Sequence, residues 1–157
     1  MSDFPKARSI FHRIPPPIWL FGFMALAWLI ARYIPQANIL PDQLRALGYF
    51  QIGLGLVLAA DVAIRFFRKK TPIHPFAAAR RLVTDGMLRF SRNPIYFGLV
   101  LILFGYVLLR GSVIGLALIP AFMWAMTEFV IKDEEAMLEA EFGDEYRDYK
   151  SRVRRWL

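Results

Sequence analysis

The chain has 157 residues, of which 57% are hydrophobic, and its mean hydropathy is +0.38. This composition is too apolar for a soluble domain of this length and predicts one integral-membrane domain over residues 1–157. The absence of cysteine excludes disulfides and thiolate metal sites, and with only His12 and His74, far apart, we expect no metal centre. The net charge of +7 is clustered beside apolar stretches, which favours contact with anionic lipid headgroups over nucleic acid.

Four apolar stretches predict an all-α bundle of about four transmembrane helices. In chain order they cover residues 18–34, 47–67, 93–109 and 112–131. The first follows a run of three prolines and is just long enough to cross a bilayer. The charged tail, 132–157, is predicted to stay helical to about Phe142, to break at Gly143 and to form a second short helix through Val153.

The Lys and Arg residues predict the orientation in the membrane. Three lie before the first stretch, seven in 68–94 and six in the tail, whereas 35–46 and 110–111 carry one each. By the positive-inside rule, both termini and the 68–94 loop are expected in the cytoplasm, and the small size suggests a bacterial inner membrane.

Two charged pairs inside the apolar stretches have alternative readings. Asp61 and Arg65 are one helical turn apart, so they either neutralise each other or bind a polar group of a ligand. Glu128 lies one turn before Lys132 and has the same two readings.

A polar motif at each end of one apolar hairpin is the strongest functional signal. Ser91-Arg92-Asn93-Pro94-Ile95-Tyr96-Phe97-Gly98 opens the third stretch, and Lys132-Asp133-Glu134-Glu135 follows the fourth. Only Arg110-Gly111-Ser112 lies between the two stretches, so they should run antiparallel and bring both motifs to one membrane face. The simpler alternatives are that Pro94 only begins a helix and that the acidic pair only neutralises Arg89 or Arg92.

The combined pattern resembles the integral-membrane methyltransferases, which include the isoprenylcysteine carboxyl methyltransferases and the phospholipid methyltransferases. The resemblance runs from about Leu82 to Trp156 and includes Phe142-Gly143-x-x-Tyr146-x-x-Tyr149. It implies that S-adenosylmethionine is the cofactor, bound by a Gly-x-Gly pair and the acidic pair beside the Asn-Pro-x-Tyr-x-Gly segment. The cofactor-binding residues expected on this basis are Gly53, Gly55, Arg92, Asn93, Pro94, Tyr96, Gly98, Glu134, Glu135 and Tyr146.

Methyl transfer from a sulfonium needs no metal, redox group or covalent intermediate, and the sequence shows none of the usual machinery for these. In-line displacement requires the two reactants to be held end to end with water limited. Carboxylates can accept from the ribose hydroxyls or ammonium of the cofactor, and Arg89 or Arg92 can meet its carboxylate. Glu128 and Arg89 are the candidate catalytic residues, Glu128 because it could take a proton from the acceptor.

The expected acceptor is lipophilic and arrives from the membrane. Asn93 stands where eukaryotic isoprenylcysteine enzymes have His, and Thr127–Lys132 lacks the arginines that those enzymes carry before the acidic pair. Both departures favour an amine-bearing lipid slightly over a carboxylate. The alternatives are an NADPH-dependent reductase of the sterol-reductase type, for which Arg80-Arg81 could clamp a phosphate, and a non-enzymatic scaffold or transporter.

Overall fold

The computed structural model describes residues 14–68 and 82–157, and it confirms the all-α class. Ten helical segments occur in these ranges, and no strand does. In chain order they are α1 (Pro16–Tyr33), η2 (Pro35–Ala37), α2 (Asp42–Arg68), η3 (Gly86–Arg89), α3 (Pro94–Arg110), η4 (Ile114–Ala117), α4 (Leu118–Met126), η5 (Thr127–Ile131), α5 (Lys132–Phe142) and α6 (Asp144–Arg152). About half of the 68–94 loop, residues 69–81 with His74, Arg80 and Arg81, lies outside the described ranges, as does His12.

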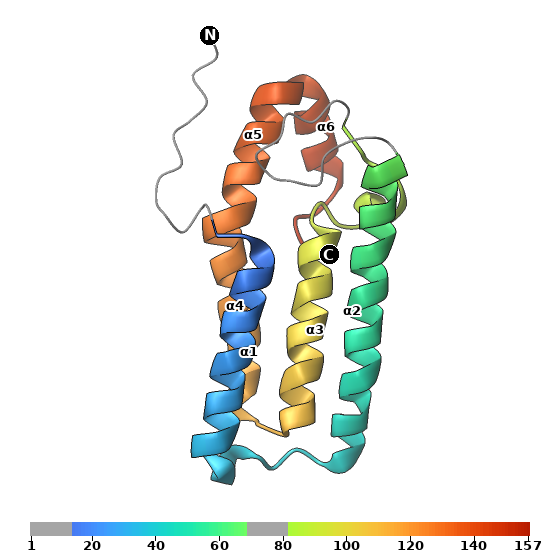
Figure 1. Cartoon of the computed structure of the whole chain (residues 1–157). Coiled ribbons are helices and arrows are strands. Elements are labelled where there is room, and N and C mark those ends of the chain that lie inside the picture. The colour runs from blue at the N-terminus through green and yellow to red at the C-terminus, as the bar shows by residue number, and fades with distance from the viewer. Residues whose placement is uncertain (1–13, 69–81) are drawn as a thin grey trace.

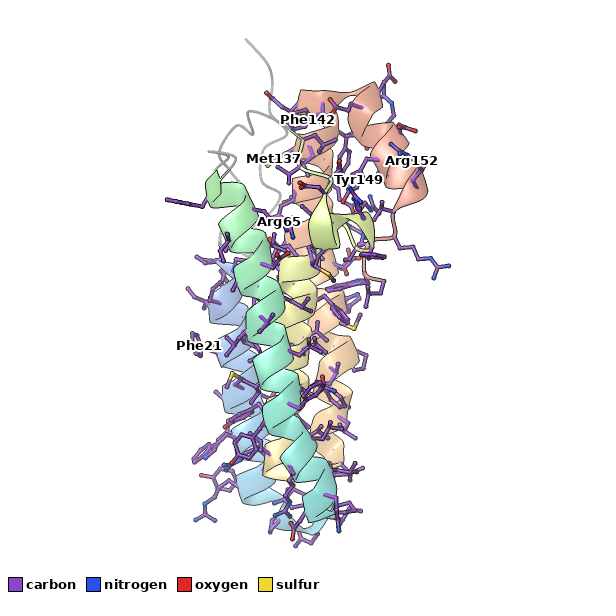
Figure 2. The ribbon with its side chains drawn as sticks, turned by 90° about the vertical axis from the view of Figure 1, so that its right-hand side faces the viewer. Phe21, Arg65, Met137, Phe142, Tyr149 and Arg152 are labelled. Carbon is purple, nitrogen blue, oxygen red and sulfur yellow. The ribbon has the colours of Figure 1, made fainter. Side chains whose placement is uncertain are left out.

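Four long helical rods lie side by side, with α3 between α2 on one side and α1 and α4 on the other (Figure 1). Three of the rods are long and apolar enough to cross a membrane: α1, residues 42–65 of α2, and the continuous helical run Ile114–Phe142. α3 is shorter, and at ~1.5 Å per residue its 17 residues reach roughly 25 Å. Large apolar side chains such as Phe21, which is 66% exposed, project away from the bundle, as lipid-facing residues do (Figure 2).

The core of the bundle lies where α3 meets α1 and α4. Leu103, Val107, Phe122 and Met126 are fully buried there, and the Phe23 ring packs edge-on against Phe122 at 5.2 Å. At the far end of the bundle, the loops after α1 and α3 are joined by main-chain hydrogen bonds: Leu40 donates to Gly111 and Val113 donates to Ala37. These bonds hold the α3–α4 hairpin in register with the α1–α2 hairpin.

α2 approaches α3 through glycines that face each other in pairs. A Cβ atom on Gly55 would lie 2.5 Å from the Gly98 carbonyl oxygen, and one on Gly48 would lie 2.5 Å from that of Gly105. Such backbone contact suits a membrane bundle, in which close van der Waals packing replaces the hydrophobic driving force. It places the last turns of α2 beside the start of α3.

The fourth rod changes pitch before it leaves the bundle. Residues Thr127–Ile131 form a π-helical segment between α4 and α5, where the Thr127 hydroxyl donates to the Met123 carbonyl at 2.7 Å. The rod then runs to Phe142, and Gly143, with a φ of 53°, turns the chain into α6. α5 and α6 therefore fold over the end of the bundle at which α3 begins (Figure 1).

Candidate functional site

The α3–α4 hairpin brings the two sequence motifs together. Pro94 is the first residue of α3 and is buried, and Tyr96 follows within the first turn. The Tyr96 hydroxyl donates a hydrogen bond of 2.5 Å to Oε1 of Glu134 on α5. Glu134 Oε2 accepts no hydrogen bond from any described residue, so one carboxylate oxygen is left for another donor.

Glu135 has different surroundings from its neighbour. It is only 5% exposed, and Arg155 donates to both of its carboxylate oxygens, from Nε at 2.9 Å and from Nη2 at 2.8 Å. Nη2 of Arg92 lies 3.2 Å from Oε1 of the same carboxylate. Glu135 is thus held between two guanidinium groups, and its hydrogen bonds and negative charge raise the pKa of Arg155. The simpler reading of the acidic pair therefore applies to Glu135 and Arg92, while Arg89 makes no ion pair among the described residues.

Arg92 is buried but only partly satisfied. Its side chain is 8% exposed, and its Nε and Nη1 groups have no hydrogen-bond partner in the described ranges. Unpaired guanidinium N–H groups in such a position are costly unless a ligand accepts from them. Arg92 therefore presents two donors suited to a carboxylate or another planar anion.

The last five residues, 153–157, follow α6 without helical structure and lie against the start of α3; they are here called the C-terminal strap (Figure 1). The carbonyl oxygen of Arg154 accepts from the Arg92 amide at 2.9 Å. The carbonyl oxygen of Arg155 accepts from Asn93 Nδ2 at 3.0 Å and from the Ser91 hydroxyl at 3.3 Å. Asn93, expected at the cofactor, is thus bonded to the strap through its side-chain amide.

Two tyrosines of α6, Tyr146 and Tyr149, are buried at this end of the bundle. Tyr146 is 2% exposed, and burial, together with the charge of Glu135, raises its pKa to about 12, although Arg92 acts in the opposite direction. Tyr149 donates to the Leu88 carbonyl at 2.7 Å and so ties α6 to η3. Tyr149 and Arg152 lie at the same end of the bundle as Arg65 (Figure 2). Burial also raises the pKa of Tyr149, so both phenols are neutral at physiological pH. The predicted residue Tyr146 lies within the cluster.

The predicted glycines lie in two different environments. Gly55 and Gly98 form the closest contact between α2 and α3, so their missing side chains are explained by helix packing. Gly53 is exposed, and a Cβ atom there would meet nothing within 4 Å. The two members of the Gly-x-Gly pair thus lie on different faces of α2, one against α3 and the other exposed.

The predicted catalytic residues make no hydrogen bond to Tyr96 or Glu134 in the described ranges. Glu128, in the π-helical segment, pairs with Lys132 at 2.5 Å and is 35% exposed. It is close enough to Arg155 for its charge to raise the pKa of that guanidinium further. Arg89 is exposed at the end of η3.

Arg89 borders a cavity of about 460 Å³ between α2 and η3. The Asp61–Arg65 pair lines the same cavity and is bidentate, with distances of 2.8 and 2.9 Å. The Arg65 guanidinium lies against Gly86, where a Cβ atom would be 2.4 Å from Cζ. The mutual neutralisation of Asp61 and Arg65 is therefore present, and their side chains still face an open cavity. Its other lining residues are Val57, Leu58, Met87 and Phe90.

Sequence reasoning missed Arg155 and the strap. The basic run Arg152-Val153-Arg154-Arg155 contributes only to the predicted membrane orientation, although an arginine beyond a helix end is a candidate partner for a buried carboxylate. Which of these arginines faces inward depends on how the strap crosses α3, and no local pattern encodes that.

Comparison with known proteins places this chain among membrane methyltransferases. An uncharacterized protein of Haemophilus influenzae is 43% identical over 63 residues, which is 40% of this chain and all of that protein. Protein-S-isoprenylcysteine O-methyltransferase of Schizosaccharomyces pombe is 35% identical over 72 residues, which is 46% of this chain and 30% of the yeast protein. No solved structure matches significantly. The sequence profile described as phospholipid methyltransferase matches residues 44–145, well over half of the chain, and the protein belongs to that family.

Proposed function

We propose that this protein transfers a methyl group from S-adenosylmethionine to a lipophilic acceptor at the cytoplasmic face of the membrane. The observation that carries the proposal is the buried Arg92 guanidinium, whose Nε and Nη1 are unpaired and which lies just before the helix whose Tyr96 is bonded to Glu134. A guanidinium with two free N–H groups, in the same cluster as a partly free carboxylate, matches a zwitterionic amino-acid group, which S-adenosylmethionine carries. Membership of a methyltransferase family supports the same assignment.

The residues present fit this cofactor. Arg92 would hold its carboxylate, and Glu134 would accept from its ammonium or from a ribose hydroxyl. Tyr96 keeps Glu134 oriented by occupying one carboxylate oxygen. Asn93, Pro94 and Gly98 build the start of α3, and Tyr146 covers the cluster from α6. When bound, the cofactor supplies an electrophilic methyl group on sulfur, so the chain's task is positioning and exclusion of water.

The acceptor would reach the site from the side of the bundle. The cavity between α2 and η3 joins apolar side chains such as Val57 and Phe90 to the charged groups of Arg89 and Arg65. This mixture suits an amphiphile whose chain stays in lipid and whose headgroup reaches the boundary. Glu128 is the candidate to take a proton from an amine acceptor, since π-helical segments often occur at functional sites.

The proposed orientation follows from the cationic residues. The start of α3, α5, α6 and the strap form one end of the bundle, and most of the Lys and Arg residues in the described ranges belong to segments at that end. This supports a cytoplasmic site with both termini inside, as in a bacterial inner membrane.

The test is a titration of the purified protein in detergent with S-adenosylhomocysteine and, separately, with NADPH. We expect binding of the former only, with an affinity in the micromolar range, about −8 kcal/mol. Incubation of membranes with S-adenosylmethionine labelled in its methyl group should place the label in the organic-extractable fraction. Binding of NADPH alone would instead support a reductase, and label found only in water-soluble product would exclude a lipophilic acceptor.

A further inference from the structure

We propose that Arg155 is a positioning residue: because it takes the bidentate pairing of Glu135, it leaves Nε and Nη1 of Arg92 open for the carboxylate of the methyl donor. The inference rests on the proposed function and adds a residue that the family assignment does not supply. It starts from the unequal sharing of one carboxylate between two arginines.

Arg155 makes a stronger contact with Glu135 than Arg92 does. It makes two parallel hydrogen bonds of 2.9 and 2.8 Å, whereas Arg92 reaches only Oε1, at 3.2 Å and through Nη2 alone. A bidentate guanidinium–carboxylate pair is the stronger and more directional arrangement. Glu135 is therefore oriented by Arg155, and Arg92 contacts it through one nitrogen only.

The buried negative charge of Glu135 requires a cationic partner, and the choice of partner decides how many Arg92 nitrogens stay free. Glu135 is more than nine-tenths buried, so its charge must be compensated locally. If Arg92 were its only partner, the natural geometry would be a bidentate pair that uses two Arg92 nitrogens. Because Arg155 supplies that pairing instead, Nε and Nη1 of Arg92 stay unpaired although they are buried. With the second arginine in place, Arg92 contacts Glu135 through one nitrogen, and its other two nitrogens remain available to bind a second anion.

The strap contacts place Arg155 where its guanidinium can pair with Glu135. Its main-chain carbonyls accept hydrogen bonds from Ser91, Arg92 and Asn93, that is, from Arg92 and from both of its neighbours in the chain. Arg155→Ala keeps these carbonyl groups and removes only the guanidinium. Arg154→Ala is the matched control, because the Arg154 side chain is exposed and has no hydrogen-bond or ion-pair partner in the described part of the chain.

In Arg155→Ala, Glu135 is expected to form a bidentate pair with Arg92 and so to occupy the Arg92 nitrogens that would otherwise bind the ligand. S-adenosylhomocysteine, which carries the amino-acid carboxylate, should bind about tenfold or more weakly, the usual effect of losing a charge-assisted hydrogen bond. 5′-Methylthioadenosine lacks the amino-acid group, so its affinity should change less than about twofold. Arg154→Ala should bind both ligands as the wild type does. In a Glu135→Gln background, where the competing charge is absent, Arg155→Ala should have little further effect on S-adenosylhomocysteine.

The measurement is calorimetric titration of both ligands into the full chain in detergent, for the wild type and these variants. Equal losses for the two ligands, or the same loss with and without the Glu135 charge, would mean that Arg155 only supports the fold, and the inference would be overturned. An unchanged affinity of Arg155→Ala for S-adenosylhomocysteine would overturn it as well. Failure of the wild type to bind S-adenosylhomocysteine would instead refute the proposed function, and with it this inference.

Discussion

Gly53 and Gly55 form the Gly-x-Gly pair expected to bind the cofactor, yet alanine at the two positions should have opposite effects on stability. A Cβ atom at Gly55 would lie 2.5 Å from the Gly98 carbonyl oxygen and 2.8 Å from Cγ1 of Ile102. Ordinary contact begins near 3.4 Å, so α2 and α3 would have to separate by almost an ångström. Overpacking of this kind costs about 1–3 kcal/mol, and here the obstacle is backbone that cannot turn aside.

Gly53→Ala is the matched control, because the new methyl group would meet nothing within 4 Å. An exposed glycine inside a helix is destabilising relative to alanine, so this variant should gain about 0.5–1 kcal/mol. Thermal unfolding in detergent would place its midpoint at or above that of the wild type, while Gly55→Ala would fall by several degrees. A Gly55→Ala protein as stable as Gly53→Ala would refute the account of α2–α3 packing.

The same two variants separate packing from cofactor binding. If Gly53 contacts the cofactor, as the family resemblance implies, Gly53→Ala should lose affinity for S-adenosylhomocysteine without losing stability. An unchanged affinity would remove Gly53 from the cofactor site and leave the α2 glycines with a role in packing only.

Three further predictions concern the acidic residues and the orientation. Glu134→Gln keeps the shape of the side chain but removes a charged acceptor, so affinity for S-adenosylhomocysteine should fall about ten- to hundredfold by calorimetry; an unchanged value would contradict its role as a ligand. Glu128→Gln should lower methyl transfer to extracted lipids by roughly a hundredfold with cofactor affinity retained; full activity would leave Glu128 only its ion pair with Lys132. Single cysteines at Gln36 and Ala140, both exposed in a chain without cysteine, should be labelled on intact cells by an impermeant thiol reagent only at position 36; the opposite pattern would invert the proposed topology.

Local sequence was sufficient to predict the helical bundle and one half of the candidate site. The apolar stretches mark the four rods, and Gly143 marks the break before α6, because hydropathy and turn chemistry are properties of neighbouring residues. The meeting of Tyr96 with Glu134 was also predictable. The turn at Gly111 is so short that the two rods must be antiparallel, and this geometry brings the start of one beside the end of the other.

Only the tertiary structure decided how the acidic pair is divided. Glu134 and Glu135 are adjacent and chemically almost identical, but helix geometry turns neighbouring side chains about 100° apart, so one meets Tyr96 and the other meets Arg155. The π-helical segment before them changes the pitch of the rod, and nothing in the pattern of residues 127–131 announces it. The strap contacts that hold Arg155 join residues more than sixty positions apart in sequence. Such contacts depend on the packed positions of α3, α5 and α6 together, so they belong to the folded bundle and not to any one segment of the sequence.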